Sequence, residues 1–267
     1  MTQQNYFKNV TLLITHYNRS KSLERLLKSF QELNCVFEDV VISDDGSKQE
    51  HLVYITELKN KYNFRLITTP KNKGLGNNIN KGQDNVTTPY TLYIQEDFIP
   101  KPNFPEHFRD GLNIMEEDKQ WDMISFYAYE FYPYSRPYKL GFSEKQFKMA
   151  PWFTNNLKFY LYSDHPHLRK SSFLQKFGRY AEGLNVDKTE MLMSLSFIKN
   201  KGKALFFDDH YGLLTQDNEQ HESSTASYRK SWKNKDATYM KLGKWAYAKI
   251  KFVKLNVKLF TTRKHPG

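Results

Sequence analysis

The sequence predicts an α/β protein with a mostly parallel sheet that is flanked by helices. Over the first hundred residues, short apolar runs of strand length alternate with amphipathic runs of helical length. The connections between these runs are short, as they are in parallel α/β sheets. Each apolar run also ends in polar side chains. Because such sheets bind ligands at the carboxyl ends of their strands, we expect the functional site at this edge.

The alternation defines the expected elements one by one. The run VTLLITHYN at 10–18 predicts the first strand. The run SKSLERLLKSF at 20–30 predicts a helix capped by Ser20, because its leucines and Phe30 recur at i, i+3, i+4 and i+7. The expected elements that follow are a strand at 39–47, a helix at 50–62, a strand at 64–69, a Gly/Asn loop leading into a helix at 70–82, and a strand at 89–97.

Beyond residue 100 the pattern is less regular. The segment 126–138 holds five tyrosines, and 161–183 mixes loop and helical features. A helix is expected at 188–202, where it ends at a glycine, and a last strand at 203–207. This half of the chain therefore yields fewer secure elements than the first.

Composition limits the class of protein. Hydrophobic residues make up 39% of the chain, which suffices for a sizeable core. Cys35 is the single cysteine, so an intrachain disulfide and a zinc site built from several cysteines are both excluded. The first residues lack the pattern of a signal peptide, and no apolar run reaches the roughly 18 residues that span a bilayer. We expect a cytoplasmic protein.

The positive charge is concentrated in the C-terminal tail. The net charge is +11, but 12 of the 40 basic residues and only one acid, Asp236, lie between residues 229 and 267, so the body is neutral. The segment 240–260 interleaves lysines with apolar residues. It predicts either a basic amphipathic helix on an anionic membrane surface, or a basic helix that packs on the body with solvated lysines. Without an RNA-binding motif, no nucleic acid partner is expected.

Four segments, taken in their order and spacing, carry a family resemblance: LLITHYNRSKSLERLLKSF (12–30), VVISDDGS (40–47), NKGLGNNINKG (72–82) and LYIQEDFIP (92–100). Together they resemble the nucleotide-sugar-binding half of family 2 glycosyltransferases, which have the GT-A fold. The resemblance continues more weakly to about residue 221. It implies a domain at 1–221, with a nucleotide-sugar half at 1–100 and an acceptor half at 101–221, followed by the basic amphipathic segment 222–267.

The resemblance also implies an activity. Such enzymes move a sugar from a nucleoside diphosphate, by default UDP, to an acceptor hydroxyl, usually with inversion. The acceptor would be a glycan or a lipid-linked glycan in surface polysaccharide assembly, with the enzyme peripheral on the inner face of the membrane. The leaving diphosphate calls for Mn²⁺ or Mg²⁺, and the acceptor hydroxyl for a carboxylate base.

Residue roles follow from the same resemblance. The nucleotide would be contacted by residues at the strand ends and in the Gly/Asn loop: Thr15, Tyr17, Arg19, Asp44, Asp45, Lys73 and Gly74. Asp97 would bind the metal, and Glu96 would lie near the ribose or a metal-bound water. His221 would be a further metal ligand, with His210 as the second candidate.

The catalytic base would be Glu190, with Asp187 one helical turn away. Each of these assignments has a structural alternative. Asp44 and Asp45 could form an ordinary Asx turn, Glu96 and Asp97 a surface turn, and Glu190 a favourable acid in the first turn of a helix.

Three positions depart from the family pattern. Gln95 stands where an acid is usual, Ile79 where an arginine is frequent, and Met191 where the catalytic aspartate is usual. An amide is a weaker ligand than a carboxylate for a hard cation. The departures at Gln95 and Met191 keep a second class open, a non-catalytic relative that binds nucleotide or glycan. The basic tail keeps a third open, a basic peripheral membrane or nucleic-acid-binding module whose globular part is a scaffold.

Overall fold

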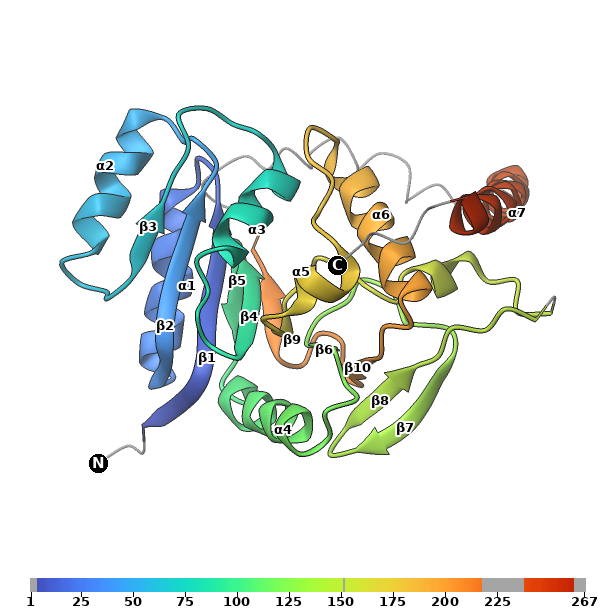
Figure 1. Cartoon of the computed structure of the whole chain (residues 1–267), viewed down its shortest axis with the longest axis horizontal. Helices are drawn as coiled ribbons and strands as arrows, with labels where there is room; N and C mark the ends of the chain where they lie inside the picture. Colours follow the sequence, from blue (N-terminus) through green and yellow to red (C-terminus); the bar gives the residue numbers. More distant parts are fainter. Residues whose placement is uncertain (1–3, 151, 218–237, 262–267) are drawn as a thin grey trace.

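A mixed sheet runs through the whole molecule (Figure 1). The computed structural model describes residues 4–150, 152–217 and 238–261, the last range with side chains from residue 248 onward. In this part of the chain the sheet has nine strands in the order β3-β2-β1-β4-β9-β6-β10-β8-β7. In the same order, beginning at the β3 edge, the strands are β3 Arg65–Ile67, β2 Cys35–Asp44, β1 Asn5–His16, β4 Tyr90–Gln95, β9 His167–Lys170, β6 Met123–Ser125, β10 Ala204–Phe207, β8 Phe142–Lys145 and β7 Ser135–Lys139.

The first half of the sheet is parallel, as the sequence predicts. Strands β1 to β4 pair in parallel, and each of the four overlaps the range in which the sequence predicts a strand. Strand β9 then runs antiparallel to both of its neighbours, β4 and β6. Beyond it β10 pairs in parallel with β6, and β8 and β7 form an antiparallel hairpin at the edge. The predicted α/β class is therefore confirmed, with an inserted antiparallel strand that the sequence did not predict.

Helices cover both faces of the sheet. Their bounds are α1 Ser20–Glu32, α2 Gln49–Leu58, α3 Leu75–Gln83, α4 Phe104–Glu117, α5 Phe173–Phe177, α6 Val186–Lys199 and α7 Thr238–Thr261, with a short 3₁₀ helix η1 at Asn156–Phe159. Strand β1 is buried on both sides. Its Leu12 and Ile14 pack in one cluster with α1, α2 and α4, and Leu13 packs in a second cluster with α3, α5 and α6.

The two-residue turn after β4 positions the first acids. Strand β4 ends at Gln95, and the short strand β5 (Phe98–Pro100) begins three residues later and pairs with β11 (Leu214–Gln216). Both residues of the turn, Glu96 and Asp97, are buried. The interpretation of these acids as a surface turn is therefore wrong.

The C-terminal segment forms the long helix α7. Leu255 and Leu259 of this helix pack on Phe159 of η1 and on Met191 and Leu195 of α6. Among the described residues, no helix combines the length and the apolar content that a bilayer crossing requires. The division between body and tail at residue 222 stays a prediction.

Candidate active site

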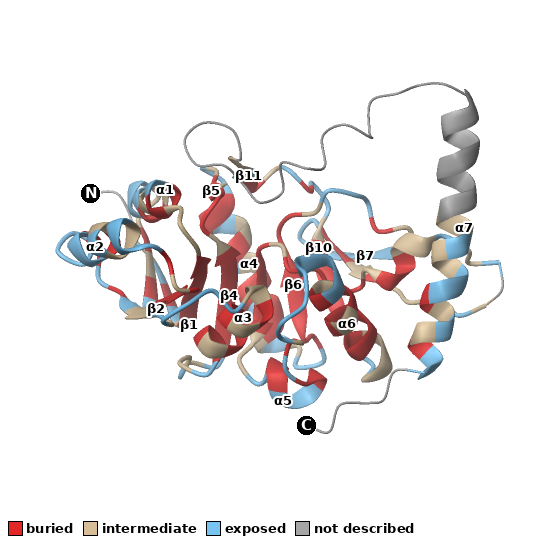
Figure 2. Cartoon of the chain, turned by 90° about the horizontal axis from the view of Figure 1, so that it is seen from above, coloured by how far each residue is buried: buried red, intermediate tan, exposed pale blue. Residues whose placement is uncertain are grey.

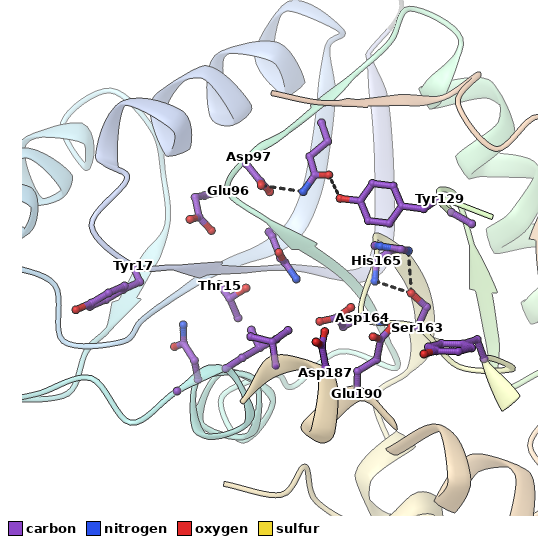
Figure 3. Close-up of a pocket in the computed structure, with 18 of the residues that line it drawn as sticks. Thr15, Tyr17, Glu96, Asp97, Tyr129, Ser163, Asp164, His165, Asp187 and Glu190 are labelled. Carbon is purple, nitrogen blue, oxygen red and sulfur yellow. Dashed lines mark hydrogen bonds between the residues drawn. The ribbon is translucent and has the colours of Figure 1, made fainter. Parts of the chain in front are cut away.

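A pocket of about 1170 Å³ opens at the carboxyl ends of β1, β2 and β4 and extends to the beginning of α6. Of the residues that the sequence predicts for the site, those on its wall are Thr15, Tyr17, Arg19, Asp45, Gly74, Glu96, Asp97, Asp187, Glu190 and His210. Figure 3 shows Glu96 and Asp97 on one side of the pocket and Asp164, Asp187 and Glu190 on the other. The fold thus joins residues from both halves of the chain in one cavity.

Asp44 lies behind the wall of the pocket. Its side chain has no exposed surface, and it hydrogen-bonds to His16 Nδ1 at 2.8 Å, the Ser47 N–H at 3.0 Å and the Thr68 hydroxyl at 2.8 Å. His16 Nε2 accepts the N–H of Arg19 at 3.0 Å, so Nδ1 carries the proton that is donated to Asp44. Asp44 therefore holds the turns after β1 and β2 together, and its expected nucleotide contact stays a prediction.

These bonds predict a stability effect. Burial opposes ionisation of Asp44, but hydrogen bonds from His16, Ser47 and Thr68 outweigh it and hold the pKa below the ordinary 3.8. Asp44→Ala is expected to lower the free energy of unfolding by about 3 kcal/mol at pH 7, measured by urea denaturation. The stabilisation should be constant well above pH 4 and decline as the pH falls further, because the carboxylate of the unfolded chain then takes up a proton while the native one stays ionised.

Asp84→Ala is the matched control. Asp84 is exposed and pairs with Arg179 at 2.7 Å, so its loss should change the free energy of unfolding by less than about 1 kcal/mol. Equal effects of the two substitutions would contradict the structural role of Asp44.

Asp45 fixes the Gly/Asn loop at the pocket. Its two carboxylate oxygens accept the backbone N–H groups of Lys73 and Gly74, each at 2.8 Å. Gly46 has φ +67°, and a Cβ there would lie 2.5 Å from the backbone of Lys71, so only glycine allows the turn to meet the loop. Lys73 meets Asp45 through its backbone, and its exposed side chain does not line the pocket; its expected nucleotide contact stays a prediction.

Arg19 bridges the two acids after β4. Its Nη1 lies 3.1 Å from Asp97 Oδ2 and 3.7 Å from Glu96 Oε1. Asp97 Oδ2 also accepts a hydrogen bond from Gln216 Nε2 at 2.9 Å. The other oxygen, Asp97 Oδ1, is buried and has no hydrogen-bond partner among the described residues. A buried carboxylate oxygen without a donor is suited to a cation, because leaving it unpaired costs free energy.

The protein alone offers few metal ligands. Within the residues that the structure describes, no three His, Cys, Asp or Glu side chains gather as a metal site. His221 lies outside the described residues. His210 lines the pocket, where its ring packs on Phe131 and Phe206. A divalent ion would thus take one or two carboxylates here and complete its shell with phosphate oxygens and water, a mode that suits Mg²⁺.

A second pair of carboxyl groups comes from the second half of the chain. Asp164 precedes β9 and Glu190 lies in the first turns of α6; the Asp164 N–H donates to Glu190 Oε1 at 3.4 Å. Burial, then repulsion from Glu190 and a hydrogen bond to it, raises the pKa of Asp164 well above its ordinary value. Burial also raises the pKa of Glu190, but hydrogen bonds from Ser163 and Asp164 oppose that shift. The upward shift is larger for Asp164, so Asp164 is the group of the pair that keeps a proton more readily and Glu190 the one that ionises first.

The neighbours of this pair are a buried amine and a neutral imidazole. Burial lowers the pKa of Lys145 to about 8, with the charge of Glu190 acting in the opposite direction. Burial and the charge of Lys145 lower the pKa of His165 to about 3, so its ring is neutral at pH 7. Gln216 links Asp97 to Tyr129 on the pocket wall, since it hydrogen-bonds both side chains (Figure 3).

Two of the three departures from the family pattern, Met191 and Ile79, have structural explanations. Met191 packs under α7 with Leu195 and Leu255, so it faces the core there while Glu190 reaches the pocket. Ile79 has no exposed surface and packs in the cluster of α3, α5 and α6. Asp164 escaped sequence reasoning because it follows no apolar strand, the signal that singled out the other acids.

Comparison with known proteins decides the family. The family model described as "Glycosyl transferase family 2" matches residues 11–178, more than half of the chain. The chain belongs to glycosyltransferase family 2. The resemblance carried by the four sequence segments is thereby confirmed.

Curated relatives of this glycosyltransferase match a shorter segment. Poly-beta-1,6-N-acetyl-D-glucosamine synthases of Staphylococcus epidermidis and Staphylococcus aureus (strain COL) are each 24% identical over 98 residues, which cover 37% of this chain and 24% of the relative. The match therefore spans about a quarter of the length of these relatives.

Solved structures of glycosyltransferases share the fold. Residues 1–349 of S. aureus TarS in complex with UDP-GlcNAc align with a TM-score of 0.58 and 16% identity, over 82% of this chain and 61% of that one. The mannosyltransferase PcManGT from Pyrobaculum calidifontis, in complex with GDP-Man and Mn²⁺, aligns with a TM-score of 0.51 and 12% identity, over 78% of this chain and 57% of that one. The expected GT-A fold is confirmed.

Proposed function

We propose that this family 2 glycosyltransferase moves a sugar from a UDP-sugar to a glycan hydroxyl with inversion, using Glu190 as the base. The observation that carries the proposal is that two pairs of acidic residues line the same pocket. Glu96 and Asp97 lie at the nucleotide half, and Asp164 and Glu190 at the acceptor half. Sugar transfer needs both kinds of group, one set near the leaving diphosphate and one near the attacking hydroxyl.

The nucleotide half offers a site for base and ribose. Thr15, Asp45 and the loop glycine Gly74 line it, and Asp45 is already held in place by two backbone N–H groups. A carboxylate keeps further lone pairs for a ligand N–H or hydroxyl group. The UDP-GlcNAc bound in the structurally similar TarS supports UDP as the nucleotide.

Asp97 is the residue that would hold a divalent cation, through its buried Oδ1. When bound, Mn²⁺ or Mg²⁺ supplies charge neutralisation for the leaving diphosphate. Arg19 orients the carboxylate through Oδ2. Because the protein offers so few ligands, we propose that the ion binds together with the nucleotide.

Glu190 would take the proton of the acceptor hydroxyl while that oxygen attacks the anomeric carbon and the bond to the diphosphate breaks. Asp164 carries the proton of the carboxyl pair, and its hydrogen bond stabilises the charge on Glu190. The base lies across the pocket from Asp97 (Figure 3), so attack and departure occur on opposite faces of the sugar, which produces inversion.

Calorimetry with UDP, GDP and dTDP, each with and without Mn²⁺, tests the nucleotide assignment. We expect UDP to bind most tightly and Mn²⁺ to strengthen its binding tenfold or more. Release of UDP from UDP-GlcNAc, measured in parallel, tests turnover. No binding of UDP under any condition would overturn the UDP assignment, and binding without turnover for any UDP-sugar would favour a non-catalytic relative.

A further inference from the structure

The outer face of α7 carries an apolar stripe. Ile250, Val253, Val257 and Phe260 are 67%, 60%, 58% and 70% exposed. Their spacing of three, four and three residues places them within an arc of about 80° on the helix, at about 100° per residue. A continuous exposed apolar stripe of this kind marks a surface that binds a partner.

Lysines lie along both margins of the stripe. By the same helical geometry, Lys254 lies beside one margin and Lys249 beside the other, while Lys258 and Lys251 lie farther round, toward the face that packs on the body. No acid lies in α7. The helix therefore combines an apolar stripe with cationic flanks, the pattern of helices that lie in the interface of an anionic bilayer.

The inner face of α7 holds the helix against the body. Leu255 and Leu259 are 5% exposed in the cluster with η1 and α6. Lys249 donates to the Thr154 hydroxyl at 3.1 Å, and Lys251 to the Tyr160 hydroxyl at 2.9 Å. Figure 2 shows α7 at the end of the molecule opposite α1 and α2. Trp152, which is 74% exposed, precedes Thr154 by two residues and adds an aromatic side chain to this end.

We propose that α7 lays its apolar stripe on an anionic lipid surface. Charge decides between this partner and a second copy of the chain. A symmetric dimer through the stripe would bring two acid-free helices with lysine flanks together, and like charges repel across such an interface. Anionic headgroups complement the same lysines, at about 1 kcal/mol for each lysine near the surface.

The consequence for the acceptor rests on the proposed function. Lys251 and its partner Tyr160 both line the pocket. The helix that meets the membrane thus borders the acceptor half of the active site. An acceptor glycan that is linked to a lipid would reach Glu190 from this side.

Flotation of the full chain with vesicles tests the proposal. The wild type should float with vesicles that contain about one third anionic lipid, and at least tenfold less with purely zwitterionic vesicles or at high salt. The double substitution Val253→Glu and Val257→Glu should reduce flotation at least tenfold. Val53→Glu on α2, at a side chain that is 47% exposed, is the matched control and should float like the wild type.

Either of two results would overturn the proposal: absence of wild-type flotation with anionic vesicles, or equal flotation of the double variant. A dimer seen by light scattering, and lost in the double variant without any vesicle binding, would assign the stripe to a second copy. UDP binding by the same samples shows that the variant is folded and keeps a failure of membrane binding separate from a failure of the proposed function.

Discussion

Glu190→Gln is expected to lower the rate of UDP release from UDP-GlcNAc by about 10²- to 10⁴-fold, the usual contribution of a general base. UDP binding should stay within about twofold of the wild type, because Glu190 lies in the acceptor half of the pocket, across from Asp97 (Figure 3). Glutamine keeps the size of the side chain and removes its ability to accept a proton at neutral pH. Stopped assays of released UDP and calorimetry on the same protein separate the two effects.

Two further variants make this result specific. Asp187 also lines the pocket but is exposed, and Asp187→Asn should reduce the rate far less than Glu190→Gln. Asp164→Asn keeps a donor toward Glu190 and should retain activity within about tenfold, whereas Asp164→Leu removes that donor and should lose more. If Asp187→Asn were the inactive variant and Glu190→Gln the active one, the assignment of the base would be reversed.

Asp97→Ala is expected to abolish the strengthening of UDP binding by Mn²⁺. The substitution removes the buried Oδ1 and leaves Arg19 free to meet the phosphates. Binding of UDP without metal should therefore be unchanged or tighter, while the metal-dependent gain of tenfold or more disappears. Calorimetric titrations with and without Mn²⁺ measure both the affinity for UDP alone and the gain in affinity that Mn²⁺ produces.

Gln216→Ala is the control for this second prediction. Gln216 donates to Asp97 Oδ2, so its loss disturbs the same carboxylate without removing Oδ1. It should leave most of the Mn²⁺ effect in place. A Mn²⁺ effect that survives in Asp97→Ala would place the cation on other ligands.

The first half of the fold was predictable because its signals are local. Strand and helix periods there follow one another within a few residues, and the central strands β1 and β4 have continuous buried runs. Strand β9 gives no such signal. Its sequence HLRK includes Arg169, which has no exposed surface and is satisfied by Gln83 and the Tyr180 hydroxyl. A buried arginine paired with neutral partners far along the chain cannot be recognised from its neighbours in sequence.

In the site, too, the features with a local sequence signal were predictable and the others were not. The acids after β4 were found because they end an apolar run, and the structure adds which oxygen is unpaired. Consecutive residues of an extended chain point to opposite sides, so Asp44 and Asp45 have different surroundings. The sequence did not show which of these two adjacent acids faces inward. One of them serves the core and the other the pocket.

Strand β9 also determines when the central sheet can form during synthesis of the chain. During synthesis β4 is finished at Gln95, but its open side is covered only by residues 167–170, and the strands on the far side, β6 and β10, join through β9. Until then a strand with Leu92 and Ile94 at its centre is an unprotected edge, a template for aggregation. Residues 1–100, the predicted nucleotide half, are thus not a unit of folding, because the ribosome has to deliver residues 167–170 before the open side of β4 is covered.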